Sequence, residues 1–369
     1  MYNIGIDGHM IGDHSGGNES YYTNILRNMD SPENCRLFLF LRPGVKAFPY
    51  EEKFEIIRFR SKNAFVRNFI ELPYLCKKLG LDLLHVQYFI PFWRPCKVVC
   101  LIHDICFEHF KDIFTRKEYY RQKILIPYAA TRSEIVFTVS NHAKRDIQEH
   151  YGLSDEKVCV TYNAVNSSFR RLDECELNIE ELKRKYEINE SRYILSVCNL
   201  QPRKNLVRLI NAFINMKEIY GGNEQLVIVG KKAWMFNDIL KVAIQESKDI
   251  IFTDYVSDDD LVRLYNGAAC FVYPSFFEGF GIPPLEAMAC GTPVAVSAAT
   301  ALPEVVADAG VYFDPYSEDD IRDAIHRILK DDELCRRLEN AGYQQVTKFS
   351  WKESARIITD TYLRLLERE

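Results

Sequence analysis

Short apolar segments, rich in β-branched and aromatic residues, alternate with amphipathic segments along nearly the whole chain. The strand-like segments of the first half are residues 2–7, 35–41, 54–59, 82–86, 97–102, 134–139 and 157–162. Those of the second half are residues 192–198, 224–230, 249–254, 269–274, 292–296 and 310–314. Helical patterns lie between them at 19–28, 65–79, 115–132, 141–150, 205–219, 258–267, 283–290, 317–330 and 332–348. This alternation predicts βαβ units and two parallel sheets, one in each half of an α/β protein.

The chain is too long, at 369 residues, for one ordinary hydrophobic core, so we expect two domains. The charged segment 169–191 contains no strand pattern and is predicted to be a linker with a short helix. It separates a Rossmann-like domain at 1–168 from a second Rossmann-like domain at 192–349. Residues 350–369 form a terminal helix that we expect to pack back across the domain junction. Its apolar stripe is Trp351, Ala355, Ile358, Tyr362 and Leu365.

The composition is that of a soluble globular protein, with 47% hydrophobic and 27% charged residues. No apolar run approaches the roughly 18 residues that a membrane-spanning helix needs. The first residues already form a strand pattern without a signal peptide, so we expect a cytoplasmic protein. The eleven cysteines are odd in number and form no CxxC pair, which indicates free thiols rather than a disulfide scaffold or a zinc site.

The net charge of −5 hides an asymmetry between the two halves. Residues 1–168 carry 22 Lys and Arg against 19 Asp and Glu, whereas the rest of the chain has a net charge of −8. The positive charge gathers at 42–67 and at 111–145. These stretches are either solvated helix faces or a surface for anionic lipid headgroups or a phosphate-bearing acceptor. Nucleic acid is not expected, because neither stretch joins a known reading motif.

One segment, YPSFFEGFGIPPLEAMACGTPVAVS at 273–297, combines several features of a phosphate site. A strand ends at Pro274, a glycine-bearing loop follows, and a helix begins near Pro283, where prolines are tolerated in the first turn. The free N–H groups of that helix end and its dipole then lie at the carboxyl edge of the sheet, where open α/β sheets bind phosphates. Glu278 lies in the loop and Glu286 in the helix, where a carboxylate can also complement the dipole.

Three other groups of residues lie in segments that follow predicted strands. Arg203 and Lys204 follow the strand at 192–198 and place two cations at the carboxyl edge of the sheet, where they can bind an anionic group. Gly16 and Gly17 precede the first helix, either as an ordinary turn or as a loop that lets the backbone approach a ligand. His103, followed by an aspartate, ends the strand at 97–102.

An acidic run at 258–260 has the appearance of a metal site but is better explained as a helix start. Ser257 with Asp260 makes a capping box, and the acids complement the helix dipole. No metal ligand set and no cofactor are therefore predicted.

These motifs together resemble the family-4 retaining glycosyltransferases, which have the GT-B fold of two Rossmann-like domains facing across a cleft. The segment EGFGIPPLEAMACGTPV is similar to the donor-site signature of that family, with its two glutamates. SVCNLQPRKNLVRLINAF at 196–213 resembles its pyrophosphate-binding loop, and DYVSDDDLVRLYNGAACFVYPS at 254–275 resembles its base-binding turn. The glycine pair and the His-Asp pair complete the pattern, so the resemblance covers the whole chain.

The resemblance implies roles for these residues. Glu286 would bind the ribose hydroxyls, Glu278 and His103 would lie beside the transferred sugar, and Arg203 with Lys204 would bind the diphosphate. Many family members have arginine where this chain has Asn199, so Arg203 is expected to supply the missing charge. The other donor-binding positions implied are Gly16, Gly17, Tyr255, Val256, Phe280, Gly281, Ile282 and Leu285.

The sequence therefore predicts a retaining, metal-independent hexosyltransferase. It would move a hexose from a nucleotide diphosphate sugar, GDP-mannose being the best match, to a glycan or lipid-linked acceptor in polysaccharide synthesis. It would work in the cytoplasm or at the inner face of the membrane. A UDP-hexose donor, a GT-B epimerase and an inactive sugar-nucleotide binding module remain as alternatives.

Overall fold

The computed structural model describes residues 1–12, 16–45, 51–189, 192–230 and 248–367 and divides the chain into two compact units. The first unit comprises residues 1–163 and 350–369, and the second comprises 164–349. Residues 13–15 of the predicted glycine loop and 46–50 of the first basic stretch lie outside the described residues. Each unit is a parallel sheet covered by helices on both faces, so the predicted α/β class and the two Rossmann-like sheets are confirmed.

The described part of the first unit holds a sheet in the order β3-β2-β1-β4-β5-β6-β7. Its strands are β1 (Tyr2–Asp7), β2 (Cys35–Leu41), β3 (Glu55–Arg58), β4 (Leu83–Gln87), β5 (Lys97–Leu101), β6 (Val136–Thr138) and β7 (Val158–Val160). Its helices are α1 (Gly17–Asn28), α2 (Ala64–Val66), α3 (Leu72–Lys78), α4 (Cys106–His109), α5 (Arg116–Arg132), α6 (Asn141–Tyr151) and α16 (Trp351–Glu367). The strand pairs are parallel. The inner strands β1, β2, β4, β5 and β6 are mostly buried, as expected for a sheet covered on both faces, whereas the edge strands β3 and β7 are partly exposed.

One face of this first sheet packs against α3, α5 and α6. Its core contains Leu84 and Cys100 from the strands together with Leu72, Ile126 and Ile147 from the three helices. Burial of such side chains supplies most of the driving force for folding the unit.

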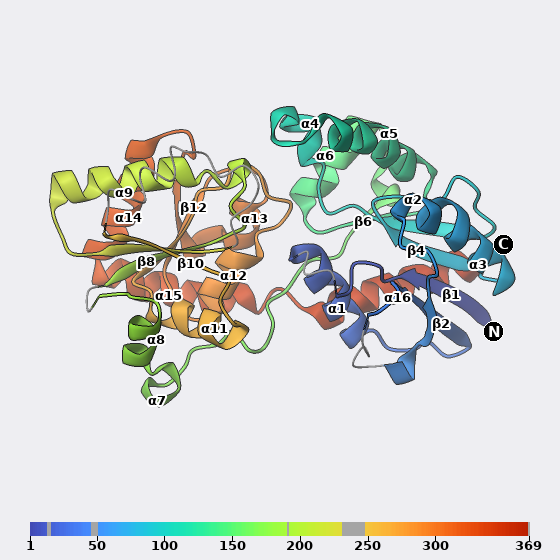
Figure 1. The fold of residues 1–369 in the computed structure, drawn as a ribbon, viewed down its shortest axis with the longest axis horizontal. Helices are drawn as coiled ribbons and strands as arrows, with labels where there is room; N and C mark the ends of the chain where they lie inside the picture. Colours follow the sequence, from blue (N-terminus) through green and yellow to red (C-terminus); the bar gives the residue numbers. More distant parts are fainter. Residues whose placement is uncertain (13–15, 46–50, 190–191, 231–247, 368–369) are drawn as a thin grey trace. The chain divides into compact units, whose positions relative to one another are not determined.

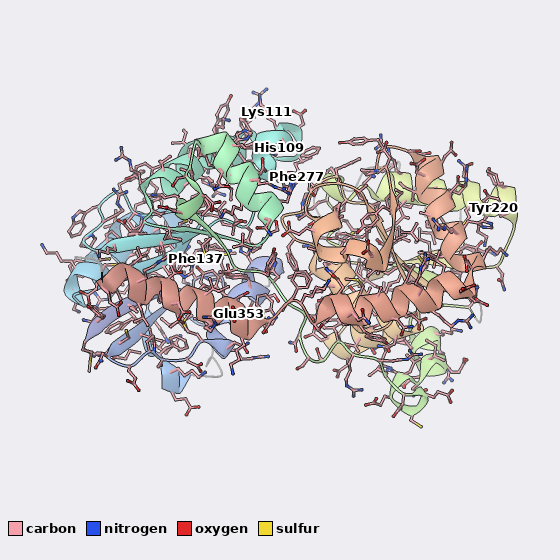
Figure 2. All side chains as sticks on the ribbon, turned by 180° about the vertical axis from the view of Figure 1, so that it is seen from behind. His109, Lys111, Phe137, Tyr220, Phe277 and Glu353 are labelled. Atoms are coloured by element: carbon pink, nitrogen blue, oxygen red, sulfur yellow. The ribbon has the colours of Figure 1, made fainter. Side chains whose placement is uncertain are left out.

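The helices α1 and α16 pack against each other on the opposite face. The predicted stripe of α16 is buried, and Tyr362 at its centre lies edge-on to Phe137 of β6, with the two ring centroids 6.5 Å apart. Figure 2 labels Phe137 beside the ribbon of α16. The Tyr362 hydroxyl is 2.5 Å from Nδ1 of His85, which is buried in β4. The end of the chain is thus part of the first unit, although the second unit precedes it in sequence.

A single predicted helix over 65–79 is not what the structure contains. The segment begins as α2, continues as a π-helical turn over Arg67–Glu71 and ends as α3, in which Pro73 occupies the first turn. In a π-helical turn the hydrogen bonds join residues five apart instead of four, so the turn holds an additional residue. The Arg67 side chain in this turn is buried.

The second unit has strands in the order β10-β9-β8-β11-β12-β13 among its described residues. They are β8 (Tyr193–Val197), β9 (Gln225–Val229), β10 (Ile250–Asp254), β11 (Cys270–Tyr273), β12 (Val294–Ser297) and β13 (Gly310–Phe313). Its helices are α7 (Glu174–Leu177), α8 (Ile179–Lys185), α9 (Leu206–Tyr220), α11 (Asp258–Gly267), α12 (Ile282–Ala289), α13 (Leu302–Val306), α14 (Glu318–Lys330) and α15 (Asp332–Val346). In Figure 1, α9 and α14 cover one face of this sheet, and α11, α12 and α15 cover the other.

The order of the strands fixes where a ligand can bind. In the second sheet the order reverses between β8 and β11, and in the first sheet it reverses between β1 and β4. The loops that leave neighbouring strands at such a point run to opposite faces, which opens a crevice at the carboxyl edge of the sheet. The sequence motifs lie on the loops that follow β8, β11, β1 and β5.

Candidate active site

A buried ion cluster lies at the reversal point of the second sheet. The Oε1 atom of Glu278 is 2.6 Å from Nζ of Lys204 and 2.9 Å from Nη1 of Arg203. The two cations come from the loop after β8 and the carboxylate from the loop after β11, so residues 74 and 75 positions apart meet at one oxygen. The structure therefore brings together three residues that the sequence predicted separately.

The cluster is continued by Tyr273, the last residue of β11. Its hydroxyl is 2.6 Å from Nζ of Lys204, and the same ammonium group lies 4.9 Å from the centre of its ring. Lys204 and Glu278 are each only 7% exposed. Charges removed from water to this extent interact far more strongly than surface ion pairs do.

Burial opposes the ionisation of Glu278, but the charges of Arg203 and Lys204 lower its pKa to about 2. The carboxyl group is therefore an anion at neutral pH and cannot serve as a proton donor. Because two cations surround a single carboxylate, the cluster keeps an excess positive charge. That charge favours the binding of an anionic group at this edge of the sheet.

The two loops that carry the cluster are joined to each other by hydrogen bonds. Asn205 adopts the left-handed conformation at φ 58° and donates its side-chain amide to the carbonyls of Pro274 and Pro315, at 3.1 and 2.7 Å. The backbone N–H of Phe276 donates to the carbonyl of Arg203 at 2.9 Å. These bonds hold the cations at a fixed distance from the Glu278 loop.

Thr300 supports the cluster from the loop after β12. Its hydroxyl accepts a hydrogen bond from the backbone N–H of Glu278 at 3.0 Å. The backbone of Thr300 has a φ of 54°, a strained conformation for a β-branched residue. Backbone strain of this kind is typical of residues in functional sites, where the surrounding structure compensates for its cost in stability.

Helix α12 begins at the end of the Glu278 loop. Gly281 precedes its first residue with a φ of 109°, and a Cβ atom added there would lie 2.6 Å from Cδ2 of Leu302. Only glycine fits this position. The side chains of Phe280 and Leu285 are buried and Ile282 is half-buried, so a ligand at this helix end would meet mainly backbone N–H groups.

Glu286 lies one turn further along α12, and its Oε2 accepts a hydrogen bond from the hydroxyl of Tyr265 in α11 at 2.9 Å. Burial raises the pKa of this carboxyl group to about 7, and the charge of Asp258 adds to the effect. Glu278 and Glu286 therefore differ in charge state near neutral pH, because only Glu278 has cations beside it.

The remaining positions predicted for the donor lie on loops at the same carboxyl edge of the second sheet. Asn199 is exposed after β8, and Tyr255, 68% exposed, follows β10 next to the buried Val256. An exposed aromatic ring at this edge offers a flat surface to a planar ligand.

The predicted capping box at the start of α11 is only half present. Ser257 accepts the N–H of Asp260 as expected, at 3.3 Å. The Asp260 side chain does not return this bond but pairs with Lys185 at 2.5 Å and with the hydroxyl of Tyr186 at 2.7 Å. The prediction of the reciprocal bond was wrong, because a long-range cation competes for the carboxylate.

In the first unit, His103 lies just beyond the carboxyl end of β5. Its Nε2 is 2.7 Å from Nε2 of Gln87, the last residue of β4, and the ring packs edge-on to Tyr21 with centroids 5.1 Å apart. Burial lowers the pKa of His103 to about 3, so the imidazole is neutral at physiological pH. It can donate or accept a hydrogen bond but does not supply a positive charge.

The glycine pair lies at the start of α1. Gly16 has a φ of 72° and precedes the helix, Gly17 is its first residue, and both are exposed. Asp7, at the end of β1, is buried. Its carboxylate accepts a hydrogen bond from the backbone N–H of His9 at 3.2 Å and another from Nδ1 of the same residue at 2.8 Å.

Several of these site residues were missed by sequence reasoning: Asp7, Gln87, Tyr273 and Thr300. Asp7, Gln87 and Tyr273 each end a strand, and a polar side chain at the carboxyl end of a parallel strand was the available signal. Thr300 carried no signal, because its role depends on a backbone angle.

A possible metal-binding group lies elsewhere in the first unit. Ligand atoms of His109 in α4 and of Asp146 and His150 in α6 lie within 4.8 Å of one another. Nε2 of His109 is 2.8 Å from Oδ1 of Asp146, a distance that a hydrogen bond between the two helices already explains.

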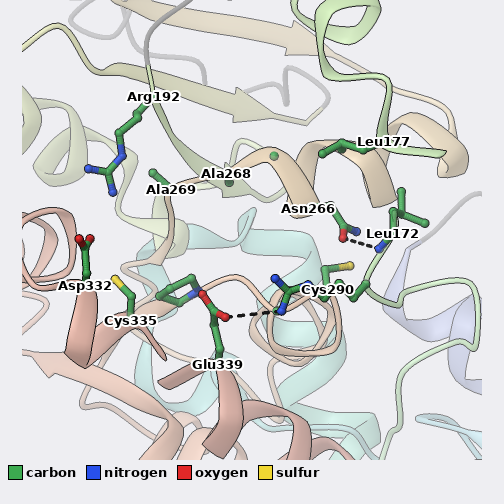
Figure 3. Close-up of a pocket in the computed structure, with 14 residues that line it drawn as sticks. Leu172, Leu177, Arg192, Asn266, Ala268, Ala269, Cys290, Asp332, Cys335 and Glu339 are labelled. Atoms are coloured by element: carbon green, nitrogen blue, oxygen red, sulfur yellow. Dashed lines mark hydrogen bonds and ion pairs between the residues drawn. The ribbon is translucent and has the colours of Figure 1, made fainter. Parts of the chain in front are cut away.

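The structure also contains a hollow of about 440 Å³ at the opposite edge of the second sheet (Figure 3). It is lined by Arg192, Ala269 and Pro293, which directly precede β8, β11 and β12, and is flanked by the ion pair of Arg171 with Glu339 at 3.6 Å. None of the predicted site residues lines it.

Two Rossmann-like units, each built on a parallel sheet, are the architecture of the GT-B class of glycosyltransferase folds. Sucrose-phosphate synthase from Thermosynechococcus elongatus has the same fold, with a TM-score of 0.77 over 100% of both chains at 18% identity. The predicted GT-B fold is confirmed by this likeness.

Family comparisons agree with the predicted resemblance. The family described as "Glycosyltransferase Family 4" matches residues 15–169, and that described as "Glycosyl transferases group 1" matches residues 178–345. The O-antigen chain mannosyltransferase B of Escherichia coli is 32% identical over 277 residues, 72% of this chain and 70% of that protein. The chain belongs to the group 1 glycosyl transferases, with a family 4 glycosyltransferase N-terminal half.

A longer relative matches over a similar range. The serotype-specific mannosyltransferase WbdA of Escherichia coli is 32% identical over 281 residues, which are 74% of this chain. The match covers 34% of WbdA, so the chain corresponds to about a third of that protein.

Proposed function

We propose that this chain transfers a mannosyl residue from a nucleotide diphosphate sugar, GDP-mannose, to a hydroxyl group of a growing polysaccharide. The observation that carries the proposal is the buried cluster in which Arg203 and Lys204 share the single carboxylate of Glu278. Mannosyl transfer is supported by the two relatives from Escherichia coli, a serotype-specific mannosyltransferase and an O-antigen chain mannosyltransferase.

In this proposal the diphosphate of the donor binds to Arg203, Lys204 and the N–H groups at the start of α12. The cations then stabilise the negative charge that grows on the diphosphate as the glycosidic bond breaks. Glu278 accepts hydrogen bonds from the hydroxyls of the sugar. Because its pKa is about 2, it remains an acceptor and does not donate a proton.

The sugar is transferred with retention of its anomeric configuration. Glu278 is held by two cations, which makes its carboxylate a poor nucleophile. We therefore favour a front-face substitution in which the leaving phosphate takes the proton of the acceptor hydroxyl. Oriented cations do the work of a metal ion in this scheme, so the reaction needs no divalent metal.

The outer parts of the donor are assigned to the remaining predicted positions. Glu286, once ionised, accepts the ribose hydroxyls, and Tyr255 and Val256 contact the base. Asn199 lies in the loop that binds the diphosphate, where Arg203 supplies the charge. The first unit binds the acceptor, and there the neutral His103 positions the transferred sugar while Gly16 and Gly17 allow a close backbone approach. The enzyme would act in the cytoplasm at the inner face of the membrane. No helix in the described part of the chain is long and apolar enough to span a bilayer.

Calorimetry of the full-length chain with GDP and with UDP tests the choice of donor. GDP is expected to bind at least about tenfold more tightly, and the Glu286→Gln variant is expected to weaken it by about 1.5–3 kcal/mol, the value of a hydrogen bond to a charged group. Tighter binding of UDP would favour the alternative, a UDP-hexose donor. Equal weak binding of both, unaffected by Glu286→Gln, would remove the nucleotide from this site.

A further inference from the structure

Large apolar side chains on one surface of the first unit are exposed to solvent. The exposed positions are Phe65, Val66, Ile70, Tyr74, Phe92, Trp93, Tyr120 and Ile124, with exposed fractions between 36% and 67%. They come from the segment α2–α3, from the loop between β4 and β5, and from α5, and we call them the aromatic surface. Soluble proteins rarely expose such a contiguous set without a partner.

The three elements are joined into one surface by ring contacts. Phe69, between α2 and α3, stacks on Phe92 with centroids 4.8 Å apart, and Phe92 lies 5.3 Å from Tyr128 of α5. Arg94 donates to the Tyr128 hydroxyl at 3.0 Å. The loop 88–94 is therefore held between the two helical segments, and the exposed rings stand on a packed base.

The spacing of the exposed residues is helical. Val66, Ile70 and Tyr74 follow one another at four-residue steps, and Tyr120 and Ile124 are likewise one turn apart on α5. The buried residues of α5, among them Ile126 and Ala129, face the core. Each helical segment thus has a second apolar face, in addition to the one that packs on the sheet.

Basic residues surround these apolar faces. Residues 62–94 and 116–132 together contain ten Lys and Arg, of which Arg67 is buried, against three Asp and Glu. The three acids are engaged with nearby groups: Glu71 accepts two backbone N–H groups, Asp82 accepts one from Asn3, and Glu118 caps α5. The charge presented beside the apolar side chains is therefore positive.

We infer that the aromatic surface docks on an anionic lipid bilayer, with its apolar side chains at the level of the acyl-chain boundary and its cations at the headgroups. A basic surface with exposed Phe, Trp, Ile and Tyr is the composition that binds interfaces of this kind. Aromatic rings also stack on sugars, but the aliphatic Val66, Ile70 and Ile124 cannot do so, and their exposure beside the rings favours a lipid surface. The proposal gives the acceptor of the proposed transfer a location: a lipid-anchored chain at the membrane surface.

Vesicle binding of the full-length chain tests this inference. Wild-type protein is expected to sediment with vesicles of equal parts phosphatidylcholine and phosphatidylglycerol, and to bind pure phosphatidylcholine vesicles at least about tenfold more weakly. The emission of Trp93 should shift to shorter wavelength on binding, measured as the difference from the Trp93→Phe variant.

Two sets of variants separate the apolar and the electrostatic parts. The triple variant Ile70→Ser, Phe92→Ser, Ile124→Ser and the double variant Lys78→Gln, Lys117→Gln are each expected to lower the partition coefficient by about tenfold or more. Ile219→Ser is the matched control, because Ile219 is 56% exposed on α9 of the second unit. It should bind vesicles as the wild type does.

Vesicle binding and nucleotide binding test the surface assignment and the proposed function separately. Binding that ignores lipid charge, or that survives the triple variant, would overturn the inference, as would retention on soluble polysaccharide without vesicle binding. GDP affinity, measured by calorimetry on the same variants, should be unchanged. A chain that binds vesicles but no nucleotide would refute the proposed function and leave this surface assignment standing.

Discussion

Replacing Lys204 with methionine tests the ion cluster, because it removes the charge and keeps most of the apolar stem. Nζ of Lys204 lies 2.6 Å from both Glu278 and the Tyr273 hydroxyl, and the residue is 7% exposed. The negative charge on the diphosphate grows in the transition state, so the loss should be greater there than in the bound donor. We expect kcat to fall about 10²- to 10³-fold, and the donor KM to rise by less than about tenfold.

The same substitution should also affect folding. Glu278 keeps only Arg203, at 2.9 Å, as a cationic partner in a buried site. Removing one member of a buried ion pair lowers the free energy of unfolding by about 3–5 kcal/mol. Because Arg203 remains beside Glu278, we expect a loss of about 3 kcal/mol. Kinetics are therefore measured well below the Tm of the variant, with the Tm determined by calorimetry.

Lys217→Met provides the matched control. Lys217 lies on α9 of the same unit and pairs with Asp249 at 2.5 Å, but at the amino end of β10. It should turn over donor at the wild-type rate. A Lys204→Met enzyme with normal kcat would show that the diphosphate binds elsewhere, and the assignment of Arg203 and Glu278 would be lost with it.

Four further predictions concern charge states and metals. Glu286 has a pKa of about 7 in the folded chain and 4.5 as its ordinary value, so the native state holds its proton between those pH values and the unfolded state does not. The free energy of unfolding, measured by urea titration, should therefore fall by about 1–3 kcal/mol from pH 5 to pH 8. The Glu286→Gln variant should lack this contribution to the pH dependence. If the variant shows the same pH dependence of stability as the wild type, the assigned pKa is refuted. Nucleotide affinity should rise over the same pH range, because only the ionised carboxylate accepts the ribose hydroxyls, and a flat calorimetric profile would count against that role. His103→Asn should lower kcat without altering its pH profile between pH 5 and 8, since the neutral imidazole does not titrate there; a lost ionisation would make it a proton carrier instead. Turnover should survive EDTA, and loss of activity restored by Mg²⁺ or Mn²⁺ would contradict the role given to Arg203 and Lys204.

Most of the fold could be predicted from the sequence because both sheets are parallel and buried on both faces. Strands of this kind are continuous apolar runs, and each predicted run corresponds to a strand of the structure. The π-helical turn at Arg67–Glu71 could not be predicted, because the apolar period there also fits an ordinary helix.

The predicted site depended on which physical signal each residue carried. Arg203, Lys204 and Glu278 were identifiable because charged residues follow buried strands, and the topology then brought their side chains together. The difference in pKa between Glu278 and Glu286 was not accessible, since it arises from partners that are distant in sequence. Asp260 shows the same limit, because its pairing with Lys185 spans 75 residues and displaced the predicted capping bond.

NMR of the product formed from GDP-mannose labelled with ¹³C at the anomeric carbon tests the proposed transfer most directly. We expect a new anomeric signal on a polysaccharide acceptor with the same α configuration as the donor. The signal should form in the presence of EDTA and be greatly reduced by Lys204→Met. A β-linked product would contradict retention. Release of free mannose alone, or no consumption of GDP-mannose while a UDP-hexose is consumed, would contradict the proposed transfer.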